Sequence, residues 1–171
     1  MFLKKSGFQH NWLWTAAILL LTACFCSMSA TMMAASPPED SSSSAAEIPA
    51  AALIQPQELE QWLRSDKEKP LILQVGSHVM FAEAHIPGSE YIGPSSQPTG
   101  IQQLRERVKA LPKDKALVIY CGCCPWHKCP NIRPAYQELH TLGFTQLKVL
   151  YIADNFGTDW VSKGYPVAKG R

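Results

Sequence analysis

Residues 116–120 read Ala-Leu-Val-Ile-Tyr, and Cys121 follows them directly. The stretch is apolar throughout and does not alternate between apolar and polar residues. A strand with this pattern is buried on both faces, as the inner strands of parallel sheets are. We therefore predict a central parallel strand over residues 116–120, with Cys121 just beyond its carboxyl end.

Strands and helices alternate on both sides of this stretch. Short apolar strands are predicted over residues 52–54, 71–75, 91–92 and 147–152. Amphipathic helices are predicted over residues 56–63, 99–111 and 131–142, with a last helical turn over 159–163. This alternation predicts an α/β fold, in which a central, mostly parallel sheet of about five short strands is flanked by helices.

Local signals place the starts of two of these helices. Thr99 is followed three positions later by Gln102, which is the spacing of a capping box. Asn131 precedes the apolar residues of the next helix and is a favoured N-cap residue. We expect Thr99 and Asn131 to cap their helices through their side chains.

The N-terminal segment has the pattern of an export signal. Lys4 and Lys5 precede the apolar run of residues 12–23, which is short for a membrane span. The quartet Leu21-Thr22-Ala23-Cys24 resembles the lipobox of bacterial lipoproteins, in which the signal is cut before a cysteine that is then lipidated. We expect residues 1–23 to be a signal peptide and Cys24 to carry a lipid anchor. The alternative is ordinary cleavage near Ala30 or Ala35, which would leave a soluble periplasmic protein.

Residues 24–51 separate this signal from the α/β pattern. They are rich in Ser, Ala, Met and Pro, and they show no apolar period. Such a composition is typical of a flexible tether. We thus expect a tether over residues 24–51 and one domain over 52–171. We expect the protein to be exported to the bacterial cell envelope, where a lipid would anchor it to a membrane and the domain would face the periplasm.

The net charge limits the classes of partner that the protein can bind. Of 171 residues, 46% are hydrophobic, and the net charge of +2 is accounted for by Lys4 and Lys5. Without a basic region there is nothing to attract nucleic acid, so we expect no such partner.

Four of the six cysteines lie between Cys121 and Cys129. This clustering favours a functional site over a disulfide framework, whose cysteines would be spread along the chain.

Cys121 has the sequence position of a nucleophile. It follows a buried strand, and the loop of residues 122–130 leads from it into a helix. Ligands of open α/β sheets gather at the carboxyl ends of strands. Unpaired amides at the start of a helix lower the pKa of a nearby thiol. The alternative is that Cys121 is only a small buried apolar residue.

Several motifs resemble the rhodanese-like domain family, over about residues 52–167. His85-Ile86-Pro87-Gly88-Ser89 resembles the segment before the family's active site, and Val118-Ile119-Tyr120-Cys121 its catalytic strand. Leu142-Gly143-Phe144 and Gly164-Tyr165-Pro166-Val167 resemble its closing segment. The resemblance implies a sulfurtransferase that needs no cofactor. Cys121 would take sulfane sulfur from a small donor such as thiosulfate, form a persulfide and pass the sulfur to a thiol or to cyanide.

The chain departs from the family pattern at several places, among them Ala84 before His85 and Asn155-Phe156 before Trp160, where the family has glycines. Gln74-Val75-Gly76 stands where the family usually has Asp-x-Arg. The loop after Cys121 is longer than the family's and is rich in soft or aromatic side chains. The predicted active-site loop residues are Gly122, Cys123, Cys124, Trp126, His127 and Cys129.

This unusual loop leaves other functions open. Cys123, Cys124, His127 and Cys129 are soft ligands that suit zinc or Cu(I), although a metal is not required by the resemblance. Cys129 could instead pair with Cys123 or Cys124 in a disulfide, or one of these could resolve a persulfide on Cys121. A catalytically silent binding module is the third alternative. Arg133, at the start of the following helix, is predicted to bind an anionic donor.

Overall fold

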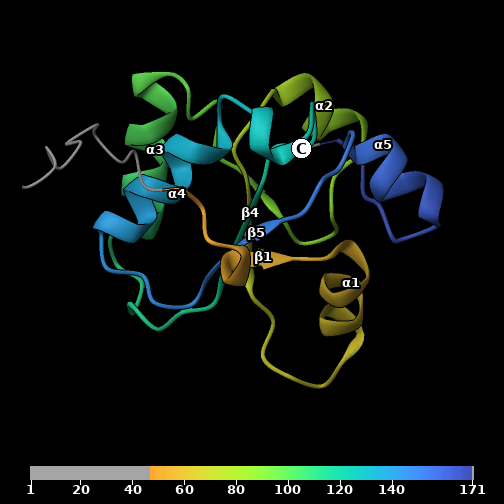
Figure 1. Ribbon diagram of the computed structural model, residues 1–171, viewed down its shortest axis with the longest axis horizontal. Helices are drawn as coiled ribbons and strands as arrows, with labels where there is room; N and C mark the ends of the chain where they lie inside the picture. Colours follow the sequence, from red (N-terminus) through yellow and green to blue (C-terminus); the bar gives the residue numbers. More distant parts are fainter. Residues whose placement is uncertain (1–46, 171) are drawn as a thin grey trace, which may run out of the picture. The chain divides into compact units, whose positions relative to one another are not determined.

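The computed structural model describes residues 47–170 (Figure 1). The predicted signal peptide, the lipidated Cys24 and nearly all of the tether lie outside these residues. Within the described part of the chain, no helix combines the length and apolar character needed to cross a membrane. Ile48 belongs to the same hydrophobic core cluster as Ala52, so the packed domain includes a few residues before residue 52.

The sheet has five parallel strands in the order β1-β5-β4-β2-β3. Their bounds are β1 Leu53–Ile54, β2 Leu71–Gln74, β3 Glu90–Tyr91, β4 Leu117–Tyr120 and β5 Leu147–Leu150. In the register, Ile119 of β4 lies opposite Leu73 on one side and Val149 on the other. Every residue of β4 is buried. The predicted α/β fold with a buried parallel strand before Cys121 is therefore confirmed.

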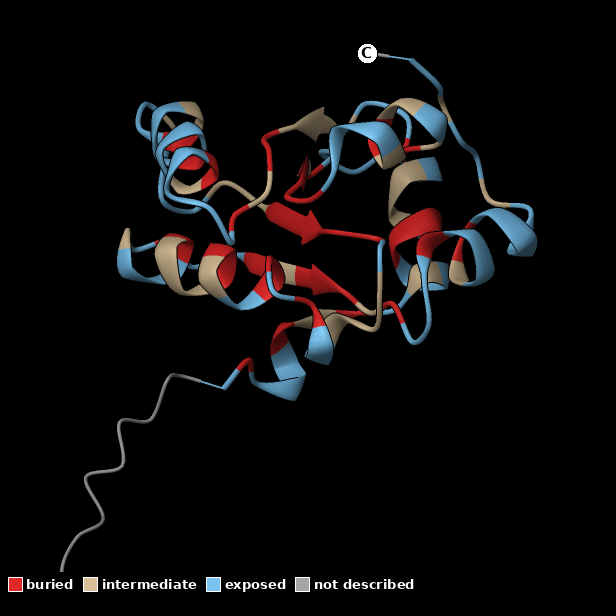
Figure 2. Cartoon of the chain, turned by 90° about the horizontal axis from the view of Figure 1, so that it is seen from above, coloured by how far each residue is buried: buried red, intermediate tan, exposed pale blue. Residues whose placement is uncertain are grey.

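Helices cover both faces of the sheet. The α-helices are α1 Pro56–Arg64, α2 His78–Glu83, α3 Pro98–Val108, α4 Ile132–Thr141 and α5 Phe156–Asp159, and three short 3-10 turns are η1 Ala50–Ala52, η2 Trp126–Lys128 and η3 Val161–Lys163. Helices α3 and α4 lie on one face, while α1 and α5 lie on the other (Figure 1). Figure 2 shows the buried strands between helices whose outer surfaces are exposed.

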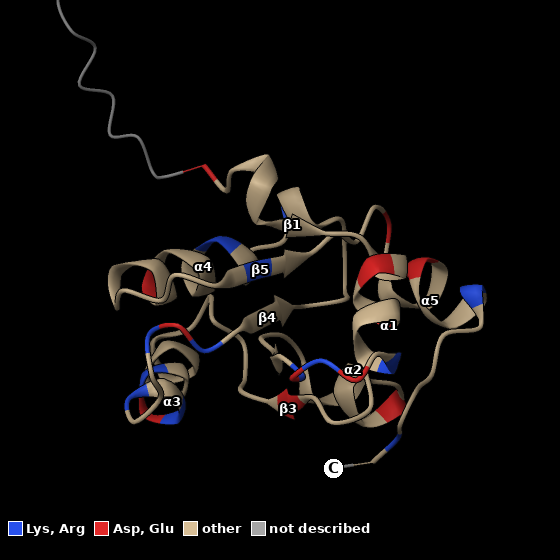
Figure 3. Ribbon diagram, turned by 90° about the horizontal axis from the view of Figure 1, so that it is seen from below, with Lys and Arg blue, Asp and Glu red and all other residues tan. Residues whose placement is uncertain are grey.

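Charged residues lie mainly on the outside of this arrangement, and α3 carries both signs (Figure 3). Arg105 of α3 binds Glu138 of α4 through two hydrogen bonds, and Arg107 binds Glu90 of β3 in the same bidentate manner. Hydrogen bonding from Arg107 lowers the pKa of Glu90. These pairs connect α3 to α4 and to β3.

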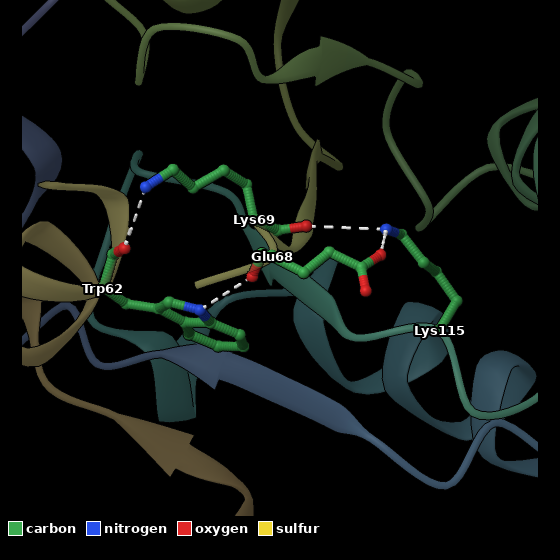
Figure 4. Close-up of polar contacts among 4 residues, drawn as sticks. All are labelled: Trp62, Glu68, Lys69 and Lys115. Atoms are coloured by element: carbon green, nitrogen blue, oxygen red, sulfur yellow. Dashed lines mark hydrogen bonds and ion pairs between the residues drawn. The ribbon is translucent and has the colours of Figure 1, made fainter. Parts of the chain in front are cut away.

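The connection between α1 and β2 is held by polar contacts (Figure 4). Trp62 at the end of α1 donates from its indole nitrogen to the carbonyl of Glu68 at 3.0 Å. The Glu68 carboxylate accepts from Lys115, which immediately precedes the β4 region, and Lys115 also reaches the carbonyl of Lys69. These contacts lie at the amino ends of β2 and β4. The carboxyl ends of the strands, where Cys121 lies, are at the opposite end of the sheet.

The start of α3 differs from the sequence prediction, whereas that of α4 agrees with it except for the capping bond. Helix α3 begins at Pro98 with Gln97 as its N-cap, so Thr99 lies inside the first turn. Proline is favoured at this position because its fixed φ suits a helix and it has no N–H to leave unpaired. Asn131 does occupy the N-cap position of α4, but its side chain makes no capping bond. That side chain bonds elsewhere, as described below.

The last helical turn also begins earlier than expected. Helix α5 spans Phe156–Asp159, and η3 follows over Val161–Lys163. The Asn155 side chain accepts from the Thr158 N–H and so caps α5. Trp160 separates the two turns with a non-helical backbone, and its side chain is fully buried. The predicted turn over 159–163 is therefore two short turns around a buried tryptophan.

Candidate active site

Cys121 is held at the carboxyl end of β4 by the neighbouring strand. The Val75 N–H donates to the Tyr120 carbonyl at 2.9 Å, and the Gln74 side chain donates to the Cys121 carbonyl at 3.0 Å. Gln74 in turn accepts from the N–H of Gly76. Cys121 is 3% exposed. The backbone that carries its sulfur is therefore fixed from β2 as well as from β4.

Gly76 makes room for the sulfur. A Cβ atom at position 76 would lie 2.6 Å from Cys121 Sγ, a distance that real Cβ contacts essentially never show. The departure from the family pattern at Gln74-Val75-Gly76 thus has a structural explanation. The glutamine supports the first carbonyl of the loop, and the glycine leaves space for the thiol.

Two further cysteine sulfurs, those of Cys123 and Cys129, lie beside Cys121, and the sulfur of Cys124 lies beside Cys123. Cys123 Sγ lies 3.2 Å from Cys121 Sγ, 3.2 Å from Cys124 Sγ and 3.9 Å from Cys129 Sγ. The sulfurs of Cys121, Cys123 and Cys129 all lie within 4.8 Å of one another. The four described cysteines are free thiols, since an S–S bond requires about 2.05 Å.

The hydrogen bonds in this cluster favour ionisation of Cys121. Donation from the Cys129 thiol is the largest effect, followed by the Cys123 amide and thiol and by the Asn131 side chain. Together they outweigh burial and lower the pKa of the Cys121 thiol to about 6. The same contacts raise the pKa of the thiols that donate the hydrogen bonds. Hydrogen bonding to Cys121 raises the pKa of Cys129, and partial desolvation of the Cys123 sulfur by its neighbours raises the pKa of Cys123 to about 12.

Asn131 joins the sulfur to a second loop. Its Nδ2 donates to Cys121 Sγ at 3.4 Å, while its Oδ1 accepts from the Ser96 N–H at 2.9 Å. The side chain is buried, so these two bonds use both ends of the amide. Asn131 is therefore a site residue, and this use explains why its side chain does not cap α4.

The long loop is tied to the rest of the domain at two points. The Trp126 N–H donates to the Ile152 carbonyl, and the Phe156 N–H donates to the Gly122 carbonyl, both at 2.9 Å. Gly122 has φ = 88° and lies so close to Phe156 that a Cβ would approach the phenylalanine Cβ to 2.9 Å. A side chain at position 122 would therefore be strained and would disturb the turn that positions the cysteines.

Cys121 also opens to a cleft of about 560 Å³. The cleft is lined by Gln74, Met80, Glu83, Ala84, Tyr120, Cys121, Asn155, Phe156, Gly157, Thr158, Val161, Ser162, Val167 and Lys169. Burial raises the pKa of Tyr120 to about 12, so its hydroxyl remains neutral, and it accepts from the Ile86 N–H. Glu83 and Lys169 supply the cleft's charged side chains, one of each sign.

The other predicted site residues lie outside this cleft. Arg133 is exposed and is not among the lining residues, so the anion-binding role assigned to it stays a prediction. Trp126 is half-buried beside Tyr151, and His127 is exposed. His127 is not part of the described group of converging ligand atoms, whereas Cys123 and Cys129 are.

Sequence reasoning missed Gln74, Gly76 and Asn131 as site residues. One signal pointed to the first two, because the carboxyl ends of parallel strands share one edge of a sheet. Gln74 ends β2, which pairs directly with β4. Glu83 and Lys169 carried no such signal, because Glu83 reaches the cleft from α2 and Lys169 reaches it from the C-terminal segment. That segment meets the α2 region through His85, which exchanges backbone hydrogen bonds with Ala168.

The fold and site define a class of α/β domain that presents a thiol at the end of an inner parallel strand. A family model for the rhodanese-like domain matches residues 55–152, which is more than half of the chain. The chain therefore belongs to the rhodanese-like domain family. A search of curated proteins found no match.

Solved structures share this fold at low sequence identity. The BH2092 protein from Bacillus halodurans is 21% identical with a TM-score of 0.53, and the match covers 68% of this chain and 76% of that one. The Alr3790 protein from Anabaena sp. is 19% identical with a TM-score of 0.53, covering 68% and 92%. An EanB variant with a cysteine persulfide and ergothioneine is 20% identical with a TM-score of 0.53, covering 68% of this chain and 28% of EanB.

Proposed function

We propose that this domain is a sulfurtransferase that carries sulfane sulfur as a persulfide on Cys121. The surroundings of Cys121 are the observation on which the proposal rests. The Cys121 sulfur accepts several hydrogen bonds that favour its thiolate, and the same residue lines a cleft large enough for a small substrate. A thiolate is the nucleophilic form of cysteine. Membership in the rhodanese-like family and the persulfide borne by EanB are consistent with this chemistry.

The reaction has two displacement steps. The Cys121 thiolate attacks the outer sulfur of a donor, the donor's S–S bond breaks, and its remaining part leaves with the electron pair. An acceptor thiolate then attacks the outer sulfur of the Cys121 persulfide, and Cys121 leaves as a thiolate. Sulfur is transferred as a neutral atom, so no external oxidant or reductant is consumed.

The hydrogen-bond donors around Cys121 stabilise the thiolate at both ends of this cycle. Preorganised donors are effective because they need no rearrangement as charge develops. Here the Asn131 amide, held by Ser96, is one such donor, and the Cys123 and Cys129 thiols are two more. Cys123 and Cys129 therefore act as positioning residues in this proposal, while Cys121 alone carries the sulfur.

The charges of the cleft favour a particular donor. Glu83 and Lys169 are of opposite sign, so the lining side chains provide no net positive charge. Several lining residues are apolar, among them Met80, Phe156 and Val161. Such a cleft suits an organic persulfide or polysulfide with one negative charge better than doubly charged thiosulfate. The acceptor is a small thiol that enters by the same opening.

The place of action is proposed from the N-terminal pattern. The quartet Leu21-Thr22-Ala23-Cys24 behind a positively charged start supports export and a lipid anchor on Cys24. A multiply acylated cysteine provides stable membrane attachment. The domain would then handle sulfur in the bacterial cell envelope, either anchored to a membrane or, after cleavage elsewhere, as a soluble periplasmic protein.

The test is to map the persulfide. The reduced full-length protein is exposed briefly to thiosulfate or, separately, to an alkyl persulfide, and its peptides are analysed by mass spectrometry. We expect an added sulfur on Cys121, more from the alkyl persulfide, and none in Cys121→Ser. Cys124→Ser is the matched control, because Cys124 contacts only Cys123 within the cluster.

Two results would reject the proposal. Sulfur on Cys123 or Cys124 with Cys121 unmodified would move the carrier into the loop. Sulfur on none of the described cysteines, in reduced and metal-free protein, would favour a silent binding module.

A further inference from the structure

We propose that Cys121, Cys123 and Cys129 form a three-sulfur site for a soft metal ion, namely Cu(I). The three sulfur atoms lie within 4.8 Å of one another, and Cys121 and Cys129 are buried. The sulfurs come from both ends of the loop, so their convergence is a property of the folded domain. This proposal concerns binding and stands independently of the sulfur transfer proposed above.

The sulfurs lie close to the spacing that a shared metal ion requires, and one of the two closest pairs already has it. Metal–sulfur bonds of about 2.3 Å place two thiolates on one ion roughly 3.8–4.0 Å apart, for tetrahedral to trigonal angles. Cys123 Sγ lies 3.2 Å from Cys121 Sγ and 3.9 Å from Cys129 Sγ. Small side-chain rotations would therefore place all three sulfurs at bonding distance from one ion, without movement of the buried backbone.

Backbone amides already point at two of the sulfurs. The Cys123 amide donates to Cys121, and the Asn131 amide donates to Cys129. In both cases the donor is two residues after the cysteine that accepts. Amide donors of this kind stabilise sulfur that carries negative charge, as a metal-bound thiolate does. The Asn131 side chain adds a third donor at Cys121.

Charge balance also favours a cation in the cluster. Once Cys123 and Cys129 lose their protons, three thiolates at contact distance would repel one another, and within residues 47–170 no lysine or arginine forms an ion pair or hydrogen bond with these sulfurs. A soft cation would supply the missing positive charge, and protons would leave the thiols as it binds.

The number of ligands selects the ion. Cys124 lies 3.2 Å from Cys123 but is not in the group of mutually close sulfurs, and His127 is not in it either. Structural zinc sites use four protein ligands, and the three-ligand zinc sites of enzymes contain histidine and complete their coordination with a water. Soft thiolates also select Cu(I), and a three-sulfur set satisfies this ion without a fourth ligand. Because Cys121 would be a ligand, bound Cu(I) and a persulfide on Cys121 exclude each other.

The experiment measures Cu(I) affinity directly, without a sulfurtransfer assay. The parent is the reduced full-length chain with Cys24→Ser and Cys26→Ser, so that the N-terminal thiols contribute nothing. Cu(I) is titrated anaerobically against a chromophoric chelator, and X-ray absorption reports the coordinating atoms. We expect one Cu(I) per chain with a sulfur-only first shell.

Variants of the loop cysteines test the ligand set. Cys123→Ser and Cys129→Ser should each weaken Cu(I) binding by more than roughly 100-fold, since loss of even an outer-shell partner costs about 10–100-fold. Cys124→Ser is the control and should bind like the parent. Cys123 is exposed, so its variant keeps the test valid if Cys129→Ser fails to fold.

Three outcomes would overturn the proposal. The first is a parent that does not compete with the chelator for Cu(I). The second is a Cys124→Ser variant that loses as much affinity as Cys123→Ser. The third is a site that binds Zn(II) with four ligands in preference to Cu(I). A protein that binds Cu(I) as described but accepts no sulfur would support this inference while rejecting the proposed sulfurtransferase.

Discussion

Gly76→Ala tests whether the space beside Cys121 sets the reactivity of its thiol. The glycine is not in a left-handed conformation, so alanine is opposed only by the contacts of its Cβ. That Cβ would lie 2.6 Å from Cys121 Sγ, whereas ordinary contacts begin at 3.4 Å. The sulfur must therefore move by about 0.8 Å or the strands must separate, and overpacking of this kind costs ~1–3 kcal/mol.

The shift should weaken the hydrogen bonds to the thiolate. These contacts are 3.2 Å from Cys123 Sγ and 3.4 Å from Asn131 Nδ2, so a displacement of that size is large for them. A hydrogen bond to a charged group contributes ~1.5–3 kcal/mol, which is about a 10- to 100-fold change in the ionisation constant. Loss of one such bond would raise the pKa of Cys121 and lower its thiolate population near pH 6 by roughly 5- to 50-fold.

The assay is alkylation of Cys121 by iodoacetamide, followed by peptide mass spectrometry across a range of pH. We expect the rate at pH 6 to fall in proportion to the thiolate population. Gly143→Ala is the matched control, because a φ of 86° makes alanine strained there while the added Cβ would meet no atom within 4 Å. The control should lose stability but keep the alkylation profile of its folded fraction. A folded Gly76→Ala protein whose rate at pH 6 stays within about twofold of the parent would refute the reasoning.

Three further predictions follow from the same contacts. In the parent, Cys121 alkylation should rise with pH to half of its plateau at about pH 6, because the thiolate forms above the lowered pKa. Cys129→Ala should move this midpoint to higher pH by removing the main hydrogen-bond donor, and an unmoved midpoint would contradict the assigned cause. Trp160→Ala should lower the free energy of unfolding by ~3–5 kcal/mol in urea denaturation, because the side chain is fully buried, and a loss below ~1 kcal/mol would show that its packing is unimportant. Cys24→Ser should release the protein from membranes on fractionation, and a variant that sediments like the parent would reject the lipid anchor.

The fold was predictable because its signals are local. The continuous apolar run of β4 predicts a strand buried on both faces, and the helices reveal themselves by the spacing of their apolar residues. Helix starts were harder to predict, since Pro98 rather than Thr99 begins α3. Several residues can satisfy the first free amides of a helix, and the choice depends on how the preceding turn packs.

The site was predictable only in part. Cys121 follows from its place after β4, and its loop from the density of cysteines. Arg133 illustrates the limit, because its position at the start of α4 suggested an anion contact, while the structure exposes it away from the residues that line the cleft. Nearness along the chain does not determine which way a side chain points.

By itself, the sequence determined the parallel sheet, the rhodanese-like family and the position of Cys121 at a strand end, because apolar pattern and strand order are properties of the chain. Only the tertiary structure decided which groups meet the sulfur. Gln74 and Gly76 come from β2, Asn131 from the start of α4, and Cys129 from the far end of the loop. Hydrogen bonds and thiol–thiol contacts act over only a few ångströms, so the reactivity of Cys121 depends on packing between segments that are distant in the sequence.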